Sequence, residues 1–261
     1  MIKHTFAICA YGDSPFLETC IKSLVRQSVK SHVILCTSTP SPYIEKLAWK
    51  YGIPIFVRNG ESDIQTDWNF AYEQAEDGLV TIAHQDDIYH KDYAKTLFAM
   101  YRRFPDMSLF TTDYATVKER TLKRRKGLVE WVKVFLRLPL RNPCWCDRTW
   151  IKKASLIFGN SICCSSCTYN KKKLGQPLFT SDFRYVLDWD TLWKLAKEKG
   201  RFVCVERPLI YYRVHGGATT KQWIRNNRRA EEELAMFRKF WPEPVVKVLE
   251  HFYKKAYGAY D

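Results

Sequence analysis

The sequence predicts an α/β fold with a mostly parallel central sheet flanked by helices. Apolar stretches typical of buried strands alternate with helical patterns over the first third of the chain, as in parallel sheets with right-handed crossovers. Polar residues follow these apolar stretches at the same end. The chain has 261 residues, 46% hydrophobic and 15% aromatic, which is enough for a sizeable core.

The first unit of this alternation begins with an apolar run at residues 5–11, which we expect to form a strand. A glycine turn follows. Ser14 and Pro15 are then typical of a helix start, so we expect Ser14 to cap a helix whose apolar positions recur up to Val25.

Three further strands are expected at residues 32–36, 54–57 and 79–83. Ser41 should begin the helix after the first of these, and Gly52 should end it. Another helix is expected at residues 66–77. Ligands of such sheets bind at the carboxyl ends of the strands. The residues expected there are Tyr11, Thr37, Asn59, Asp86 and Asp87.

The stretch LVTIAHQDDIYHKDY, residues 79–93, ends a buried strand with two adjacent carboxylates, Asp86 and Asp87. Two unpaired like charges are costly to bury, so the pair favours a bound cation. A hard divalent metal that shares phosphate oxygens suits one or two carboxylates. A solvated acidic turn or a helix cap is the alternative explanation.

The sequence carries no pattern of secretion or membrane insertion. No apolar run approaches the ~20 residues of a membrane span, and the start MIKHTFAICAYGD lacks the design of a signal peptide. Nine cysteines without such a signal indicate reduced thiols in a cytosol. We therefore expect a cytoplasmic protein.

The net charge of +14 is concentrated in one segment. Residues 118–153 contain twelve Lys or Arg and three acidic residues, a local net charge of +9. Such a block attracts phosphates of nucleic acid, anionic lipid or a diphosphate-bearing substrate. The basic residues alternate with apolar ones and match no nucleic-acid recognition motif. A nucleic-acid-binding protein is thus an alternative, but no nucleic-acid partner is expected.

Two glycine-rich phosphate motifs are absent from the chain. The first turn, AYGDSPF, lacks G-x-G-x-x-G, and no G-x-x-x-x-G-K-[ST] is present. A nucleotide bound here would depend on a metal, rather than on a glycine-rich loop, to hold its phosphates.

Four segments together resemble family 2 glycosyltransferases. They are CAYGDSPFLETCIKSLVRQS, AHQDDIYHKDY, LDWDTLWKLAKEKGRF and LIYYRVHGGATT, in the family's order. The resemblance implies a GT-A fold with a C-terminal helical extension on the acceptor side. It implies inverting sugar transfer from a nucleotide-diphosphate donor, of the bacterial polysaccharide-biosynthesis type. It also implies two halves of one domain, residues 1–117 for the donor and 118–261 for the acceptor.

The resemblance gives roles to the acidic residues. It places Asp87 on a Mn²⁺ or Mg²⁺ ion, with Asp86 in the outer coordination shell or at the ribose. An inverting enzyme needs a carboxylate that accepts the proton of the acceptor hydroxyl. The resemblance points to Asp188, with Asp190 as the second candidate catalytic residue. These carboxylates disfavour the alternative of a sugar-nucleotide binder without catalysis.

Two local features bear on Asp188. The family's preceding glutamate is Leu187 here, an apolar neighbour that can raise the pKa of Asp188. The alternative role for Asp188 is to cap a helix at residues 189–199.

The same resemblance assigns the remainder of the donor site. Thr37 and Ser38 stand where the family has an acidic residue, which leaves the donor base open. Asn69 matches an asparagine of the third helix, and His215 could reach the metal or the diphosphate. Polar side chains without a role are the alternative for Asn69 and His215. The expected donor-binding residues are Ala10, Tyr11, Asp13, Thr37, Ser38, Asn69, Gln85, Asp86 and His215.

Residues 126–138, KGLVEWVKVFLRL, predict an amphipathic helix. Lys126, Glu130, Lys133 and Arg137 share one face, and apolar residues occupy the remainder. A narrow polar stripe on a wide apolar surface suits a helix in the interface of an anionic membrane, which would fit a lipid-linked acceptor. The alternative is a helix packed on the domain with its charges outward.

Four cysteines raise the possibility of a structural metal. Cys144, Cys146, Cys164 and Cys167 could in principle form a zinc site, but buried free thiols explain them as well. By resemblance, residues 158–169 are an acceptor-side strand.

Overall fold

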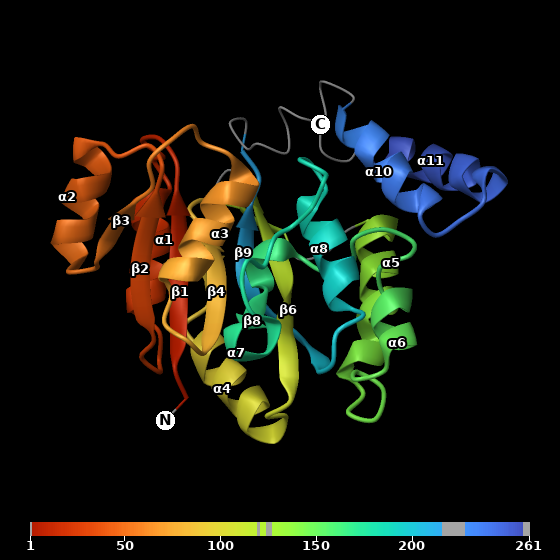
Figure 1. The fold of residues 1–261 in the computed structure, drawn as a ribbon, viewed down its shortest axis with the longest axis horizontal. Helices are drawn as coiled ribbons and strands as arrows, with labels where there is room; N and C mark the ends of the chain where they lie inside the picture. Colours follow the sequence, from red (N-terminus) through yellow and green to blue (C-terminus); the bar gives the residue numbers. More distant parts are fainter. Residues whose placement is uncertain (1, 119–120, 124–126, 216–227, 258–261) are drawn as a thin grey trace.

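A mixed β-sheet forms the centre of the protein, with helices on both of its faces (Figure 1). The structure is a computed structural model that describes residues 2–118, 121–123, 127–215 and 228–257. The strands are β1 (His4–Ala10), β2 (His32–Thr37), β3 (Ile55–Val57), β4 (Leu79–His84), β5 (Ile88–Tyr89), β6 (Met107–Lys118), β7 (Thr121–Lys123), β8 (Thr168–Asn170) and β9 (Arg201–Arg213). Their order is β3-β2-β1-β4-β8-β6-β9-β5, and β7 pairs with β6.

The first four strands follow the predicted alternation and pair in parallel. Side chains in these strands alternate between two cores, as a period of two requires. In β1, Phe6 and Ile8 enter one core and Ala7 enters the other. Since parallel strands end on the same edge, the polar residues after β1, β2 and β4 are brought together there.

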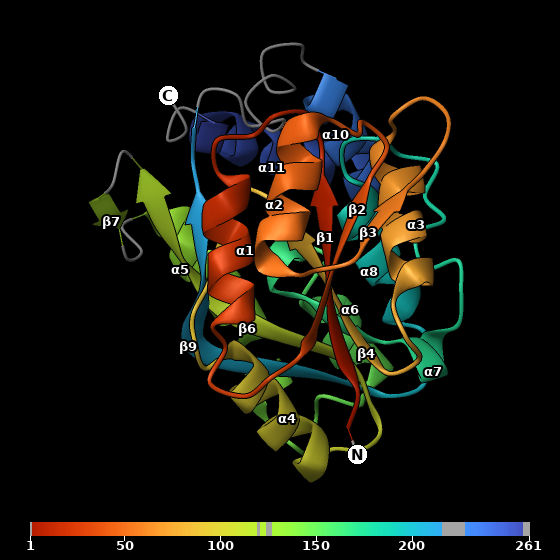
Figure 2. The same ribbon diagram turned by 90° about the vertical axis from the view of Figure 1, so that its left-hand side faces the viewer.

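Helices cover each face of the sheet. They are α1 (Leu17–Val25), α2 (Pro42–Tyr51), α3 (Ile64–Gln74), α4 (Tyr93–Arg103), α5 (Leu128–Arg137), α6 (Thr149–Ala154), α7 (Lys171–Leu174), α8 (Leu187–Leu195), α10 (Arg228–Arg238) and α11 (Glu243–Tyr257), with short 3₁₀ turns η1 (Leu138–Arg141) and η2 (Cys164–Ser166). One core contains residues of α1, α2 and α4, and the other contains residues of α3, α6, α8 and α10. Figure 2 shows α1 and α2 next to each other, with α4 at the lower end of the molecule.

Helix starts match the sequence where the capping geometry is local. Ser41 accepts a hydrogen bond from the backbone N–H of Ile44 and caps α2, and Gly52 ends that helix with a φ of 60°. The first predicted helix is present and ends at Val25, but its predicted start was wrong, because α1 begins at Leu17 and Ser14 does not cap it. The Ser14 hydroxyl instead accepts the N–H of Phe16 in the turn before the helix.

The second half adds antiparallel and irregular parts to the same sheet. β8 pairs antiparallel with β4 and β6, while β9 runs parallel to β6. The strand expected at residues 158–169 is mostly absent: η2 occupies part of it, and β8 begins only at Thr168. The proposed boundary between the halves, at residue 117, falls at the end of β6.

The helix near residue 189 begins two residues earlier than expected. Val186 is the residue that precedes α8, so Asp188 lies in its first turn and does not cap it. The predicted C-terminal helical extension is present as α10 and α11, at the upper right in Figure 1. No helix among the described residues is long and apolar enough to cross a membrane.

Candidate active site

A cavity of about 1360 Å³ opens at the carboxyl ends of β1, β2 and β4. The topology predicted this position, because ligands of such sheets bind where parallel strands end. Eight of the expected site residues line the cavity: Ala10, Tyr11, Asp13, Thr37, Gln85, Asp86, Asp188 and His215.

The loops after β1 and β4 are fixed to each other by one side chain. The amide of Gln85 donates to the carbonyl oxygen of Tyr11 and accepts the N–H of Tyr11, both at 3.0 Å. This pair of bonds extends the contact between the two strands beyond their last paired residues. It holds the turn that carries Asp86 against the first loop.

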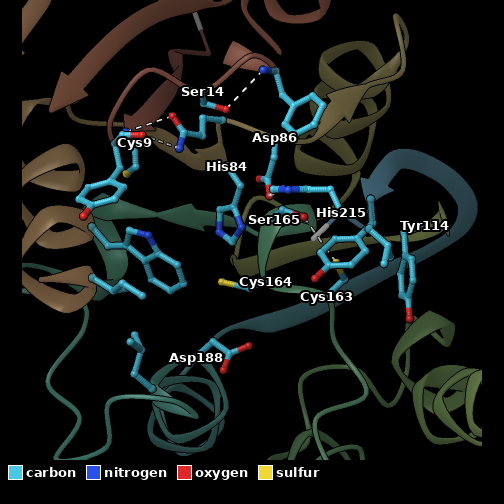
Figure 3. Close-up of a pocket in the computed structure, with 18 of the residues that line it drawn as sticks. Cys9, Ser14, His84, Asp86, Tyr114, Cys163, Cys164, Ser165, Asp188 and His215 are labelled. Atoms are coloured by element: carbon cyan, nitrogen blue, oxygen red, sulfur yellow. Dashed lines mark hydrogen bonds and ion pairs between the residues drawn. The ribbon is translucent and has the colours of Figure 1, made fainter. Parts of the chain in front are cut away.

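The end of β9 holds the acidic pair from the other side. The backbone N–H of Arg213 donates to Oδ1 of Asp87, and its Nε donates to the carbonyl oxygen of Asp86, both at 2.9 Å. Two residues later, Nε2 of His215 lies 3.1 Å from Oδ2 of Asp86. Figure 3 shows His215 beside Asp86 in the cavity.

Three side chains form a candidate metal centre. Ligand atoms of His84, Asp86 and Asp87 lie within 4.8 Å of one another. Nε2 of His84 and Oδ2 of Asp87 are buried and have no hydrogen-bond partner among the residues that the structure describes. Burial lowers the pKa of His84, which keeps the imidazole neutral and able to bind a cation. Burial, and then the charge of Asp86, raise the pKa of Asp87. This donor set fits Mn²⁺ or Mg²⁺.

Asp188 lies across the cavity from these ligands (Figure 3). Its Oδ2 accepts a hydrogen bond from Nδ2 of Asn160 at 2.8 Å. Burial raises the pKa of Asp188, and the positive charge of Arg229 opposes that rise. The carboxylate therefore binds a proton more readily than an exposed aspartate does.

Comparisons with known proteins agree with this geometry. The profile described as Glycosyl transferase family 2 matches residues 5–173. The chain belongs to this family. Comparison with curated proteins finds no match.

The family's GT-A fold recurs in similar solved structures. TarS 1–349 of S. aureus has a TM-score of 0.60 at 14% identity, over 82% of this chain and 61% of that one. The mannosyltransferase PcManGT from Pyrobaculum calidifontis, with GDP-Man and Mn²⁺, has a TM-score of 0.62 at 14% identity, over 95% and 68%. Glucosyl-3-phosphoglycerate synthase from Mycobacterium tuberculosis has a TM-score of 0.55 at 13% identity, over 91% and 76%. The chain thus spans about three fifths of the TarS 1–349 structure.

Asp190, the second candidate catalytic residue of this family 2 chain, is not among the residues that line the cavity. Its carboxylate lies 2.7 Å from Nζ of Lys239 and 2.9 Å from Nζ of Lys194. Burial opposes ionisation of Asp190, but hydrogen bonds from these lysines outweigh it and lower the pKa. Asp190 connects α8 to the chain just after α10.

Three other expected site residues, Ser38, Asn69 and Asp87, are also absent from the cavity lining. Asn69 donates to the carbonyl oxygen of Phe179 at 2.7 Å and accepts the N–H of Leu178 and Phe179, so it fixes a loop. The hydroxyl of Ser38 donates to Asp67 at 2.9 Å. Asp87 is buried and does not line the cavity.

Some cavity residues had no local signal in the sequence. Asp67 of α3 lines the cavity and pairs with Arg58 at 2.8 Å, close to the position where the family usually has an acidic residue. Its contact with Ser38, 29 residues away in the sequence, shows this proximity, which the sequence around Asp67 does not reveal. The residues that the sequence reasoning missed are His84, Asp67, Asn160 and Arg229. His84 alone had a signal, its place directly before the acidic pair.

Helix α5 packs on the domain with its charged side chains toward the cavity. This is the reverse of the alternative prediction, in which the charges point outward. Glu130, Lys133 and Arg137 line the cavity. Nη2 of Arg137 lies 2.9 Å from Oδ1 of Asp113, and its Nη1 donates to the carbonyl oxygen of Ser161. The predicted polar stripe exists, but its described members face inward. Lys126 lies outside the described residues.

The nine cysteines are all free. Within the described part of the chain, His84, Asp86 and Asp87 form the one group of three or more potential ligands, and no cysteine joins it. Burial raises the pKa of the Cys164 and Cys167 thiols, as expected of thiols that pack in a core. The zinc alternative therefore finds no support in the described residues.

Proposed function

We propose that the protein is an inverting glycosyltransferase that moves a sugar from a nucleotide-diphosphate donor to a hydroxyl group of an acceptor. One observation carries this proposal: a single cavity has a candidate metal centre at Asp86 on one side and a partly buried carboxylate, Asp188, on the other. The leaving diphosphate of the donor needs a cation, and the attacking hydroxyl group of the acceptor needs a carboxylate that accepts its proton.

Asp188 acts as the general base in this proposal. It removes the proton from the acceptor hydroxyl while the oxygen attacks the anomeric carbon on the face opposite the leaving diphosphate. Asn160 donates to one carboxylate oxygen and thereby fixes the orientation of Asp188 in the cavity. The raised pKa of Asp188 brings its proton affinity closer to that required at neutral pH.

Asp86 is proposed as the main ligand of Mn²⁺ or Mg²⁺, with His84, His215 and Asp87 close by. We assign this role to Asp86 rather than Asp87 because Asp86 faces the cavity, whereas Asp87 accepts the backbone N–H of Arg213. When bound, the cation neutralises charge on the leaving diphosphate. Mn²⁺ accompanies nucleotide ligands in two of the similar structures, which supports its choice.

The donor nucleoside is proposed to lie between the loops after β1 and β2. Thr37, Asp67 and Tyr11 line this part of the cavity and offer a hydroxyl, a carboxylate and an aromatic ring. The similar structures contain UDP-GlcNAc in TarS and GDP-Man in PcManGT, so the fold accommodates either base.

For the acceptor we propose a lipid-linked saccharide or a surface polysaccharide precursor. Residues 1–117 would bind the donor and residues 118–261 the acceptor, because Asp188 and the polar face of α5 come from the second part. The proposal places the enzyme in the cytoplasm, peripherally on the inner face of the cell membrane, without a nucleic-acid partner.

A donor screen tests this function. The protein is incubated with UDP-, GDP-, CDP- and dTDP-sugars and with Mn²⁺, Mg²⁺ or EDTA, and its thermal unfolding is recorded. The true donor should raise the unfolding midpoint only with metal, because it binds the native state. Nucleoside diphosphate release and the anomeric configuration of the product, by NMR, then report turnover. Metal-dependent binding without turnover would favour the non-catalytic binder, and retention of configuration would contradict an inverting mechanism.

A further inference from the structure

Helix α5 presents opposite kinds of surface on its two sides. Glu130, Lys133 and Arg137 face the cavity. Trp131 and Phe135, which are 61% and 72% exposed, lie on the other side one turn apart. Burial of the polar side of an amphipathic helix while its aromatic side meets solvent reverses the usual arrangement in a globular protein.

The exposed apolar surface is concentrated in this part of the chain. Of the thirteen large hydrophobic side chains that are exposed among the described residues, seven fall between residues 131 and 158. They are Trp131, Val132, Phe135, Leu138, Trp145, Trp150 and Phe158. Single exposed apolar residues are normal, but a cluster on one helix face marks an interaction surface.

The charge of this segment indicates which partner covers it. Residues 121–153 contain only two acidic residues, Glu130 and Asp147, and Glu130 faces the cavity. Residues 123–126, directly before α5 in the sequence, are all basic. Arg148, between Trp145 and Trp150, has a side chain that is 64% exposed. Tryptophan and phenylalanine among basic residues are typical of helices that lie in the headgroup region of an anionic bilayer.

We propose that the outward face of α5, defined by Trp131, Val132, Phe135 and Leu138, docks into the surface of an anionic lipid bilayer. The opposite face of the same helix continues to line the cavity, so the helix separates the lipid from the reaction site by its own width. The inference rests on the proposed function only for its purpose, the delivery of a lipid-linked acceptor. Docking itself needs no donor or metal.

Flotation of the full chain with vesicles tests the proposal. The vesicles are phosphatidylcholine alone or phosphatidylcholine with 30% phosphatidylglycerol, a composition of roughly the charge density at which basic segments bind. We expect the wild type to float with the anionic vesicles, at least tenfold less with the neutral ones, and less as salt rises. Trp131→Glu and Phe135→Ser should each lose most of the flotation.

Trp49 provides the matched control. It is 87% exposed on α2, far from α5 in Figure 1, so Trp49→Glu makes the same chemical change on another surface. Trp49→Glu should float like the wild type. Flotation is compared only among variants whose thermal unfolding midpoints match that of the wild type. Because Trp131 and Phe135 are exposed, we expect their substitution to leave the midpoint unchanged.

Several results would overturn the proposal. Wild-type protein that ignores anionic vesicles at low salt contradicts it, as does equal flotation of the Trp131 and Trp49 variants. A wild type that sediments as a dimer and becomes monomeric on Trp131→Glu, without lipid binding, would assign the face to a second copy of the chain. Nucleotide binding in each variant, measured by thermal shift, separates these failures from a failure of the proposed function.

Discussion

Asp188 and Asp190 lie two residues apart on α8, yet their carboxylates have different surroundings. Residues at i and i+2 of a helix point to different sides. Asp188 therefore faces the cavity, and Asp190 faces the lysines at positions 194 and 239. The first environment raises the pKa of its carboxyl group and the second lowers it. This difference supports the proposed role of Asp188 as the base and indicates a structural role for Asp190.

Asp188→Asn keeps the shape of the side chain but removes the proton acceptor. We expect turnover to fall on the order of a hundredfold or more, with donor affinity unchanged, because the loss is confined to proton transfer. Steady-state kinetics and donor titration measure both quantities. Asp190→Asn is the matched control. It should lower the free energy of unfolding by roughly 1 kcal/mol through the weakened lysine contacts, and leave most of the turnover. The reverse pattern would assign the base to Asp190.

Asp188→Asn should also change the stability of the protein, by an amount that depends on pH. The pKa of Asp188 in the folded protein lies above the ordinary 3.8, so its ionised form costs stability at neutral pH. This cost fades as pH falls through the folded-state pKa, and it disappears below pH 3.8, where the carboxyl group becomes protonated in both states. Asp188→Asn should therefore unfold at a higher temperature than the wild type at pH 7, by a margin that shrinks toward pH 4. A variant that is less stable than the wild type at pH 7 would contradict this. It would show that the attraction between Arg229 and the ionised carboxylate outweighs the cost of burying the charge.

Asp86 should control metal-dependent binding. In Asp86→Asn, the thermal shift produced by a nucleoside diphosphate with Mn²⁺ should largely disappear, because the cavity loses its facing carboxylate. A ligand at a hundred times its Kd stabilises the native state by about 2.7 kcal/mol, so the lost shift is easily measured. Asp106→Asn, which changes a half-exposed carboxylate outside the cavity lining, serves as the control and should keep the full shift. An unchanged shift in Asp86→Asn would remove Asp86 from the metal site.

At the scale of secondary structure, α10 fixes the segment that carries the base. The carboxylate of Glu232 accepts the backbone N–H groups of Arg184, Tyr185 and Val186, at 3.1, 2.6 and 3.1 Å. These groups directly precede α8, where a negative charge is also favoured by the helix dipole. Glu232 therefore fixes the start of α8, and with it the position of Asp188 in the first turn of that helix.

Removal of this acceptor should disturb both stability and catalysis. In Glu232→Ala, three N–H groups lose their partner, and we expect unfolding to cost roughly 1–3 kcal/mol less. Turnover should fall about tenfold at unchanged donor affinity, because the base is displaced rather than removed. Glu231→Ala changes the exposed neighbouring residue of α10 and is the control. Equal behaviour of the two variants would show that α10 does not position the base.

The elements that were predictable from sequence are those whose signal is local. The four parallel strands follow from apolar periodicity, and the start of α2 follows from Ser41. The start of α1 was not predictable in this way, because Ser14 can cap a helix or close a short turn, and here it closes the turn. The orientation of α5 depends on Asp113 of β6, which receives Arg137. Nothing within the helix sequence specifies that partner.

At the scale of the whole molecule, the topology explains which parts of the site were predictable. Residues after β1, β2 and β4 meet because parallel strands end on one edge, so Tyr11, Thr37 and Asp86 could be grouped from the sequence. Asn160 reaches the cavity from the loop between α6 and η2, and Arg229 reaches it from α10, and no sequence pattern marks either residue. Asp67 comes from α3 and accepts a hydrogen bond from Ser38, which follows the second strand.

The central claim is that one cavity combines a metal at Asp86 with a base at Asp188. Its most direct test is nucleoside diphosphate release from the donor found in the screen, with a saccharide acceptor, measured for the wild type, Asp86→Asn and Asp188→Asn with Mn²⁺ and with EDTA. The account predicts release that requires the metal in the wild type and falls at least a hundredfold in each variant. Release by the wild type that persists in EDTA, or that Asp188→Asn matches, would contradict it.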